Sequence, residues 1–368
     1  MKICYLANNA IPANVASALQ IVKMCEAFSS TGNKVLLICP GTKKIDENIF
    51  DYYDVKKKFL VKKLSSFRKF PLGLKYYLFS IISIISSLRF KADIYITRNF
   101  FTSFLLTIFG KKNILELHHG IEIESRIVRF ISRYTNFFNY KSLVRLVAIT
   151  NSVKDYYKKK YKVKEDKFLV SPSGTSIRKN NFKFFFNKKK LNIGYFGNIN
   201  KSRGVDIIVK LANMDKKNNY YIYGELSNYK NLKINCSNNL FINNYIPYKK
   251  ISEAISRMDI LIMPYTKKIT STGNVGDITK FTSPLKLFDY LANGKVIICS
   301  NITVLKEILI ENKNAIFVKN FDKTSAWKTE IEKIKKDEKK RLIISKNNFK
   351  LGKIYHHKPR AINILKDL

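Results

Sequence analysis

The order strand, loop, helix, strand occurs twice in this chain, and its first copy lies at the beginning. The apolar run KICYLA at 2–7 predicts a buried strand, and the next strand is predicted at 35–39. Between them, Ser17 followed three residues later by Gln20 is typical of a capping box, and Gly32 marks the end of a helix. Two strands joined through a helix form a βαβ unit, which restricts the chain to folds with parallel sheets.

The second copy begins after the middle of the chain. LNIGYFGNI at 191–199 predicts a strand, the loop NKSRG leads into a helix at 205–214, and a further strand is predicted at 220–223. Because each copy opens its own series of strands, we expect two parallel sheets, each covered by helices.

Shorter apolar runs extend both series. Further strands are predicted at 92–97, 113–117, 146–150, 259–263, 296–299 and 315–318. The length of 368 residues is sufficient for two domains. We therefore predict an α/β protein with a Rossmann-like domain at 1–178, a basic linker at 178–190, and a second Rossmann-like domain at 190–354. An amphipathic segment at 355–368 is expected to cross back to the first domain.

In such folds, ligands bind outside the carboxyl ends of the strands. With two such domains in succession, we expect the two sets of carboxyl ends to face each other across a cleft that holds the active site.

The charge of the chain is strongly basic. Lys and Arg number 68 against 27 Asp and Glu, which gives a formal net charge of +41. Such a charge attracts polyanions, including nucleic acid, anionic membranes and phosphorylated substrates. The alternative is a general lysine bias spread over solvated faces.

The location is predicted from the cysteines and the apolar segments. The five cysteines include no CxxC pair, and several lie in apolar runs, which favours a reducing compartment. The start, MKICYLANNAIPANVAS, is typical of a first strand and not of a signal peptide. The longest apolar stretch, Tyr76 to Leu88, is too short to span a bilayer. We expect a cytoplasmic protein, or one attached to a membrane only from the side.

One helix carries an unusual set of polar residues, in FTSPLKLFDYLANG at 281–294. Ser283 and Pro284 predict a helix start with Ser283 as the cap, and Gly294 predicts its end. Free amides at such a start favour a phosphate. Lys286 is then placed to reach the phosphate, and Asp289 to accept hydrogen bonds from sugar hydroxyls. The alternative is an ordinary surface ion pair between these two side chains.

The segment SPLKLFDYLANGKVIICSNITVLKEIL resembles the nucleotide-sugar signature of retaining GT-B glycosyltransferases of glycosyltransferase family 4. Other stretches are similar to the family in the same order: IPANVASALQIVKMCEAF, ADIYITRN, ILELHHG, VAITNSVKDYY, IGYFGNINKSRGVDIIVKLA, MDILIMPY and YHHKPRAINIL. The resemblance covers most of the chain and is weakest at 41–90 and 320–350. It implies a GT-B fold and transfer of a sugar from a nucleotide-sugar donor, with retention of configuration, in cell-surface polysaccharide synthesis.

The resemblance also implies roles for single residues. Asp289 matches the ribose-binding position, whereas Phe281 replaces the acidic residue that most of the family has eight positions earlier. The backbone at Thr282, Ser283 and Pro284 would bind the distal phosphate.

A basic pair is expected on the diphosphate in the loop after GYFG. Arg203 matches one member of the pair, and Asn198 stands at the position of the other, so Lys201 or Lys286 would compensate. Arg203 and Lys286 are thus the predicted catalytic cations.

Two histidines follow a predicted first-domain strand in ELHHG. His118 resembles the family's contact to the transferred sugar, while His119 is predicted on the acceptor side. The alternative is that both are structural. Adjacent residues of a strand point to opposite faces, and no DxD or HxxxH companion occurs, so no metal site is predicted. We expect no cofactor and no metal requirement.

The acceptor, a saccharide or lipid-linked saccharide, is expected near Asn14 and Ser17 in the loop after the first strand. The lysine-rich, apolar segment 56–90 predicts contact with an anionic membrane, or alternatively a buried helix with a solvated basic lead-in.

Two other classes of function stay open. One is a nucleotide-sugar epimerase with the same architecture. The other is a non-catalytic protein that binds polyanions or nucleic acid, although no RRM, KH or helix-turn-helix signature occurs in the sequence.

Overall fold

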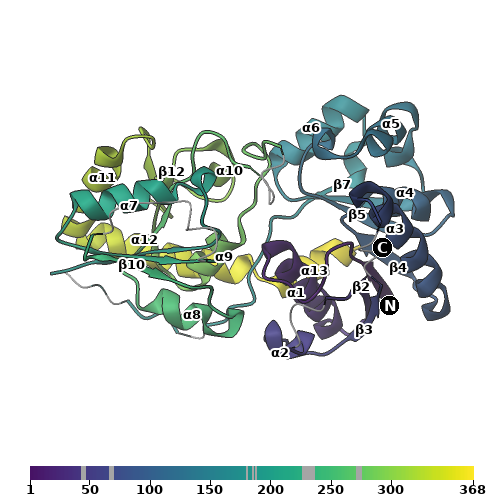
Figure 1. Cartoon of the computed structure of the whole chain (residues 1–368), viewed down its shortest axis with the longest axis horizontal. Coiled ribbons are helices and arrows are strands. Elements are labelled where there is room, and N and C mark those ends of the chain that lie inside the picture. Colours follow the sequence, from purple (N-terminus) through teal and green to yellow (C-terminus); the bar gives the residue numbers. More distant parts are fainter. Residues whose placement is uncertain are drawn as a thin grey trace. The chain divides into compact units, whose positions relative to one another are not determined.

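A computed structural model gives the structure of the chain, and the chain divides into two compact units (Figure 1). The first unit comprises Met1–Gly174, Phe281–Ser283 and His357–Leu368, and the second comprises Thr175–Lys280 and Pro284–His356. The structure describes residues 1–42, 47–65, 70–179, 181–184, 186, 189–225, 237–270 and 276–368.

The first unit is built on a sheet of seven parallel strands in the order β3-β2-β1-β4-β5-β6-β7. The strands are β1 Lys2–Leu6, β2 Lys34–Pro40, β3 Leu60–Leu64, β4 Ile94–Thr97, β5 Asn113–Leu117, β6 Leu143–Ala148 and β7 Phe168–Val170. Because β1, β4 and β5 are neighbours, the loops that follow them meet at one edge of the sheet.

Helices cover this sheet. They are α1 Ala16–Ser30, α2 Ile49–Tyr52, α3 Leu72–Ser87, α4 Phe100–Ile108, α5 Arg126–Tyr134, α6 Asn151–Tyr161 and α13 His357–Leu365, with short 3-10 turns η1 Leu88–Phe90, η2 Ile121–Ile123, η3 Phe137–Asn139 and η4 Glu165–Lys167. Helix α13 packs beside α1 (Figure 1), and its Ala361 and Ile364 are buried in the same core as Ile3 and Tyr5. The segment at the end of the sequence therefore completes the core of the first unit.

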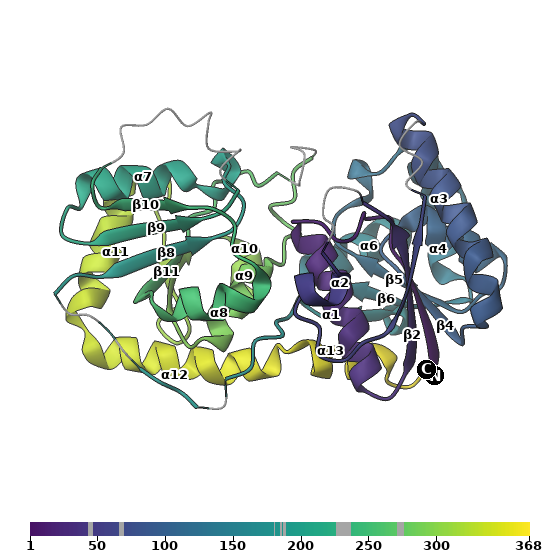
Figure 2. The same cartoon turned by 60° about the horizontal axis from the view of Figure 1, so that its bottom comes forward.

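The second unit contains six parallel strands in the order β10-β9-β8-β11-β12-β13, of which Figure 2 shows β10, β9, β8 and β11 side by side. They are β8 Asn192–Phe196, β9 Asn219–Tyr223, β10 Leu240–Asn243, β11 Ile260–Met263, β12 Val296–Ser300 and β13 Ile316–Val318. The helices are α7 Val205–Met214, α8 Tyr248–Ser256, α9 Leu285–Ala292, α10 Thr303–Lys306, α11 Thr324–Lys336 and α12 Glu338–Ile354, with η5 Lys201–Arg203. The strand order reverses between β8 and β11, which is where such sheets open for ligands.

The predicted α/β architecture with two parallel sheets is confirmed. Three strands were not predicted: β3, β7 and β10, which lie at three of the four sheet edges. Their residues are mostly half-buried or exposed, so they lack the continuous apolar run that identifies a central strand.

Two predicted helix caps are wrong. Helix α1 begins at Ala16 with Val15 as N-cap, and Ser17 accepts a hydrogen bond from Asn9 Nδ2 at 3.1 Å. Helix α9 has Pro284 at the N-cap position, and the Ser283 hydroxyl accepts from the Ser173 amide at 3.1 Å. In both places another hydrogen bond takes the oxygen that local sequence assigned to the cap: one from the same loop at Ser17, and one from a residue far away in sequence at Ser283.

The basic stretch at 178–190 differs from the predicted linker. Phe182 packs on Phe349 of α12, with ring centroids 5.6 Å apart, and the Arg341 guanidinium lies 3.9 Å from the Phe186 ring centroid. The described part of this stretch therefore belongs to the second unit, because its phenylalanines pack along α12.

The segment 56–90 forms β3 and α3, with residues 66–69 outside the described part. Helix α3 buries Phe79 and Ile84 and leaves Leu74, Ile81 and Ile85 exposed, so neither predicted alternative describes it fully. No helix in the described part of the chain has the length and apolarity needed to span a bilayer.

Candidate active site

Lys286 lies in the first turn of α9 and extends into the second unit. Its Nζ is 3.7 Å from the centroid of the Tyr195 ring and 5.7 Å from that of Tyr265. This nitrogen is buried and has no hydrogen-bond partner among the described residues. Burial, reinforced by the positive charge of Arg203, holds the pKa of Lys286 well below its usual value.

Arg203 reaches the same place from the loop that follows β8. Its guanidinium carbon lies 5.4 Å from the centroid of the Tyr265 ring, and Nη2 donates to the Thr270 carbonyl at 3.3 Å. The Asn200 side chain accepts from the Arg203 amide at 3.0 Å and caps the η5 turn. Two cationic side chains therefore meet at the point where the strand order reverses.

Two glycines make room for this arrangement. A Cβ on Gly197, whose φ is +147°, would lie 2.6 Å from Lys286 Nζ. A Cβ on Gly204, whose φ is +70°, would lie 1.6 Å from the Pro264 carbonyl oxygen. Gly204 excludes a side chain, because a Cβ would collide with the backbone of the loop after β11. At Gly197 any other residue is strained by the positive φ, and its Cβ would displace the lysine.

Asp289 points away from Lys286 and is buried. Its Oδ1 accepts hydrogen bonds from Thr175 Oγ1 at 2.7 Å and from the Tyr248 hydroxyl at 3.3 Å. The alternative of a surface ion pair between Lys286 and Asp289 is therefore wrong. The ribose-binding role of Asp289 stays a prediction.

The remaining predicted donor residues have separate positions. Asn198 and Lys201 are exposed on the loop after β8, and the Asn198 carbonyl accepts from the Tyr195 hydroxyl at 2.8 Å. Thr282 and Ser283 pack with the first unit, and Pro284 belongs to the second. Their contact with a phosphate stays a prediction.

In the first unit, His118 directly follows β5 and is held by a buried carboxylate. Its Nε2 is 2.6 Å from Glu116 Oε1, and Arg360 of α13 lies 3.4 Å from the same oxygen. Burial alone would raise the pKa of Glu116, but Arg360 and His118 outweigh it and lower that pKa. Burial, together with the Arg98 charge, lowers the pKa of His118 to about 3.

The lowered pKa of His118 means that its imidazole ring is neutral at neutral pH. A neutral imidazole beside a carboxylate donates its Nε2–H to Glu116, which leaves Nδ1 as a hydrogen-bond acceptor. His118 can therefore accept a hydrogen bond from a hydroxyl but does not supply a proton at neutral pH.

His119 is engaged within its own loop. Its Nδ1 donates to the Gly120 carbonyl at 3.0 Å, and Nε2 lies 3.4 Å from Glu124. Burial raises the pKa of Glu124. These contacts favour the structural alternative for His119, and its acceptor role stays a prediction.

The loop after β1 lies at the same sheet edge as His118. Arg98, which follows β4, donates to the Ser17 carbonyl at 3.4 Å, and Asn14 is half-buried in this loop. The edge thus brings together residues that follow three different strands, β1, β4 and β5, although contact of Asn14 and Ser17 with an acceptor stays a prediction.

No group of three or more His, Cys, Asp or Glu that could hold a metal ion occurs among the described residues. Sequence reasoning missed the partners of the predicted side chains: Tyr195 and Tyr265 around Lys286, Thr175 and Tyr248 on Asp289, and Arg360 on Glu116. Only the sequence MPY at the end of β11 gave a local signal, since Tyr265 lies two residues beyond that strand, at the predicted edge.

Solved structures with a similar fold align over almost the whole chain. Sucrose-phosphate synthase from Thermosynechococcus elongatus has a TM-score of 0.75 at 11% identity, with 99% of this chain and 97% of that chain covered. HepE from Anabaena, in complex with UDP-glucose, has a TM-score of 0.71 at 12% identity, with 100% of both chains covered. WaaG, a glycosyltransferase involved in lipopolysaccharide biosynthesis, has a TM-score of 0.63 at 11% identity, with 100% of both covered.

Two family models match consecutive parts of the sequence. Glycosyltransferase Family 4 matches residues 18–179, and Glycosyl transferases group 1 matches residues 176–351. The chain is a GT-B glycosyltransferase. Curated proteins yield no match to its sequence.

The second match places the Arg203 and Lys286 cluster in the group 1 region of this glycosyltransferase, and the first places His118 in the family 4 region. The chain is therefore an enzyme, which removes the alternative of a non-catalytic protein that binds polyanions.

Proposed function

We propose that this glycosyltransferase transfers a sugar from a nucleoside diphosphate sugar to a saccharide or lipid-linked saccharide, with retention of anomeric configuration. The observation that carries the proposal is the Lys286 amine, buried without a hydrogen-bond partner among the described residues and close to the Arg203 guanidinium. Two like charges in a buried site are unfavourable unless an anion lies between them. A diphosphate has the charge and the oxygen atoms to satisfy both.

The reaction needs stabilisation of the leaving group. The bond between the anomeric carbon and the diphosphate oxygen breaks, and the acceptor oxygen bonds to the same face of the sugar. The acceptor proton passes to the departing diphosphate. Arg203 and Lys286 stabilise the charge that develops on this diphosphate, and preorganised groups of this kind contribute about 3–4 kcal/mol each. We propose that these two side chains act without a metal ion.

His118 is assigned to the transferred sugar. With Nε2–H held by Glu116, Nδ1 accepts a hydrogen bond from a sugar hydroxyl. A neutral acceptor at this position orients the sugar without adding a positive charge near the anomeric carbon, where positive charge develops. Asp289 is assigned to the ribose hydroxyls, and Thr282, Ser283 and Pro284 to the distal phosphate.

The acceptor class is proposed from the fold relatives and from the first unit. HepE has been solved with UDP-glucose, and WaaG is involved in lipopolysaccharide biosynthesis, which supports a nucleotide-sugar donor and a role in cell-surface polysaccharide synthesis. We assign Asn14, Ser17 and His119 to the acceptor side. The proposed location is the cytoplasm, at the inner face of the cell membrane.

Thermal unfolding with a panel of nucleotide sugars tests the donor class. The correct donor is expected to raise Tm in the wild type and much less in Lys286→Met, whereas Lys210→Met, an exposed lysine on α7, keeps the wild-type response. The proposal fails if no nucleotide sugar changes Tm, or if both variants respond like the wild type.

Product analysis then separates transfer from the epimerase alternative. With the donor identified, a transferase releases nucleoside diphosphate only when an acceptor saccharide is added. Conversion of the donor to an isomeric nucleotide sugar without an acceptor would favour the epimerase.

A further inference from the structure

Helix α5 exposes an apolar stripe on the first unit. Ile127, Phe130 and Tyr134 are 51%, 63% and 65% exposed, and the rings of Phe130 and Tyr134 lie 4.7 Å apart. Val128 and Ser132 on the opposite side are buried and anchor the helix. The spacing of three and four residues places the exposed apolar side chains on one face.

A second stripe on the same helix is cationic. Arg126, Arg129 and Arg133 are exposed, and none forms an ion pair with any residue in the described ranges. No Asp or Glu occurs from Ser125 to Lys154. The solvent face of α5 therefore consists of apolar and cationic stripes side by side.

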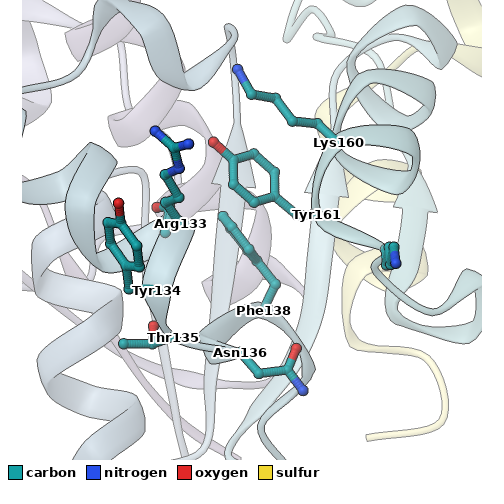
Figure 3. Close-up of a pocket in the computed structure, with 9 residues that line it drawn as sticks. Arg133, Tyr134, Thr135, Asn136, Phe138, Lys160 and Tyr161 are labelled. Carbon is teal, nitrogen blue, oxygen red and sulfur yellow. The ribbon is translucent and has the colours of Figure 1, made fainter.

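A cavity of about 320 Å³ adjoins the end of α5. Its wall includes Arg133, Tyr134 and Phe138 on one side and Lys160, Tyr161 and Lys162 from the end of α6 on the other. Figure 3 shows Arg133, Lys160 and the Tyr161 hydroxyl extending toward the same side of the cavity. Lys160 also pairs with Glu122, whereas Arg133 and Lys162 have no carboxylate partner in the described part of the chain.

The position of α5 connects this surface to the sheet edge that carries His118. The helix follows β5 through His118, Gly120 and η2. Its N-cap residue Ser125 is hydrogen-bonded to Tyr77 of α3 at 2.6 Å, and α3 exposes Leu74 and Tyr76 close to that bond in sequence. Helix α3 therefore contacts the N-terminal end of α5 and exposes apolar side chains of its own.

We propose that α5 docks this protein onto an anionic membrane surface. Ile127, Phe130 and Tyr134 enter the boundary between headgroups and acyl chains, and the three arginines contact lipid phosphates. The cavity formed with Lys160 and Lys162 binds one phosphate headgroup. A lipid bilayer fits because it offers anionic groups and apolar depth together, whereas nucleic acid offers phosphate without an apolar layer. Docking would hold the His118 edge near a lipid-linked acceptor, and only this consequence rests on the proposed function.

Vesicle flotation without donor or acceptor tests the docking directly. The probes are phosphatidylcholine vesicles with and without 30% phosphatidylglycerol. The wild type is expected to float only with the anionic vesicles. The triple variant Arg126→Gln, Arg129→Gln, Arg133→Gln should lose roughly a hundredfold in partition coefficient at low salt, and Phe130→Ser with Tyr134→Ser should lose about tenfold or more.

Matched controls separate local docking from the general charge. Lys249→Gln, Lys250→Gln, Lys339→Gln removes the same charge from exposed sites of the second unit, and Ile310→Ser with Ile343→Ser removes exposed apolar side chains there. Both are expected to bind like the wild type. The proposal would be overturned if these control variants lost as much binding as the α5 variants. It would also be overturned if the wild type bound neutral vesicles as well as anionic ones.

A fluorescent probe reports insertion without relying on folding stability. Phe130→Trp should shift its emission to shorter wavelength with anionic vesicles, against the constant signal of the single native tryptophan, Trp327, which is fully buried. Ile343→Trp should not shift. For the headgroup cavity, Lys162→Gln should weaken binding severalfold more than Lys159→Gln, because Lys159 is exposed in the last turn of α6 but does not line the cavity. No shift at position 130 would contradict docking by α5, and equal effects of the two lysine variants would contradict the headgroup site.

Discussion

Arg203 and Lys286 face the same aromatic ring, that of Tyr265, with the guanidinium carbon at 5.4 Å and the ammonium nitrogen at 5.7 Å from its centroid. The ring supplies a weak attraction for both cations, while each cation disfavours the charge of the other. The pair is thus held in position while the charged form of Lys286 is disfavoured. Such a site favours the binding of an anion, which would interact favourably with both side chains.

Replacing Lys286 by Met should stabilise the free protein and impair transfer. Methionine fills a similar volume without a buried amine, so the free energy of unfolding without donor should rise by about 1 kcal/mol or more. Transfer should fall by about a hundredfold, because one group that stabilises the leaving diphosphate is lost. Urea unfolding and initial rates measure the two effects. Lys210→Met should change neither, and a K286M protein with wild-type rates would exclude Lys286 from the site.

Diphosphate binding should take up a proton. The pKa of Lys286 is depressed by burial and by Arg203, and a bound diphosphate favours the charged amine and raises that pKa. Between the free and the bound pKa, binding therefore weakens as pH rises. Calorimetry of nucleoside diphosphate binding over a series of pH values, in buffers of different ionisation enthalpy, should show the uptake between these two pKa values. The uptake should be absent in K286M, and identical heats in all buffers for the wild type would contradict the assignment.

Substitution of Gly197 should act through Lys286. In Gly197→Ala the new Cβ would lie 2.6 Å from Lys286 Nζ at a backbone φ of +147°, so the loop or the lysine must move. We expect a loss of about 1–3 kcal/mol in the free energy of unfolding and a marked loss of donor affinity. Gly73→Ala, where a Cβ meets open space in α3, should instead be neutral or stabilising by up to about 1 kcal/mol. Similar donor affinity in both variants would show that Lys286 does not depend on this glycine.

The stability of the first unit should depend on pH through His118. Because the pKa of His118 is about 3 in the folded protein and near 6.5 when unfolded, the unfolded state binds more protons between these values. Stability from this group is therefore fully present above about pH 6.5 and is lost as pH falls, by up to about 1.4 kcal/mol per pH unit. The slope between pH 6.5 and 5 should be smaller in His118→Gln. Equal slopes in urea unfolding would mean that the imidazole is not held neutral.

Central strands were predictable because they form short, mostly apolar runs, of which ILIM in β11 is the clearest. The edge strand β3 was not, since LVKKL places two lysines in a strand with no buried residue. Its pairing with β2 is settled by backbone hydrogen bonds that leave no mark in the side-chain pattern.

The cationic side chains of the candidate site could be predicted from the sequence, but their positions relative to one another could not. Arg203 and Lys286 were identified from their motifs, yet the sequence could not show that Lys286 would be buried over Tyr195. Likewise, Ser283 matched a helix cap in sequence, but the amide of Ser173, which lies 110 residues earlier, takes its hydroxyl. Contacts of this range are decided by tertiary packing, which local propensity does not contain.

The packing of α13 on α1 has a consequence for synthesis. Arg360 partners the buried Glu116, and Ile364 fills the core beside β1, so the domain that is translated first is completed by residues translated much later. Until residues 357–365 leave the ribosome, a buried carboxylate lacks its counterion and the apolar side chains of α1 that pack against α13 are uncovered. This protein should therefore need a chaperone most while it is still a nascent chain.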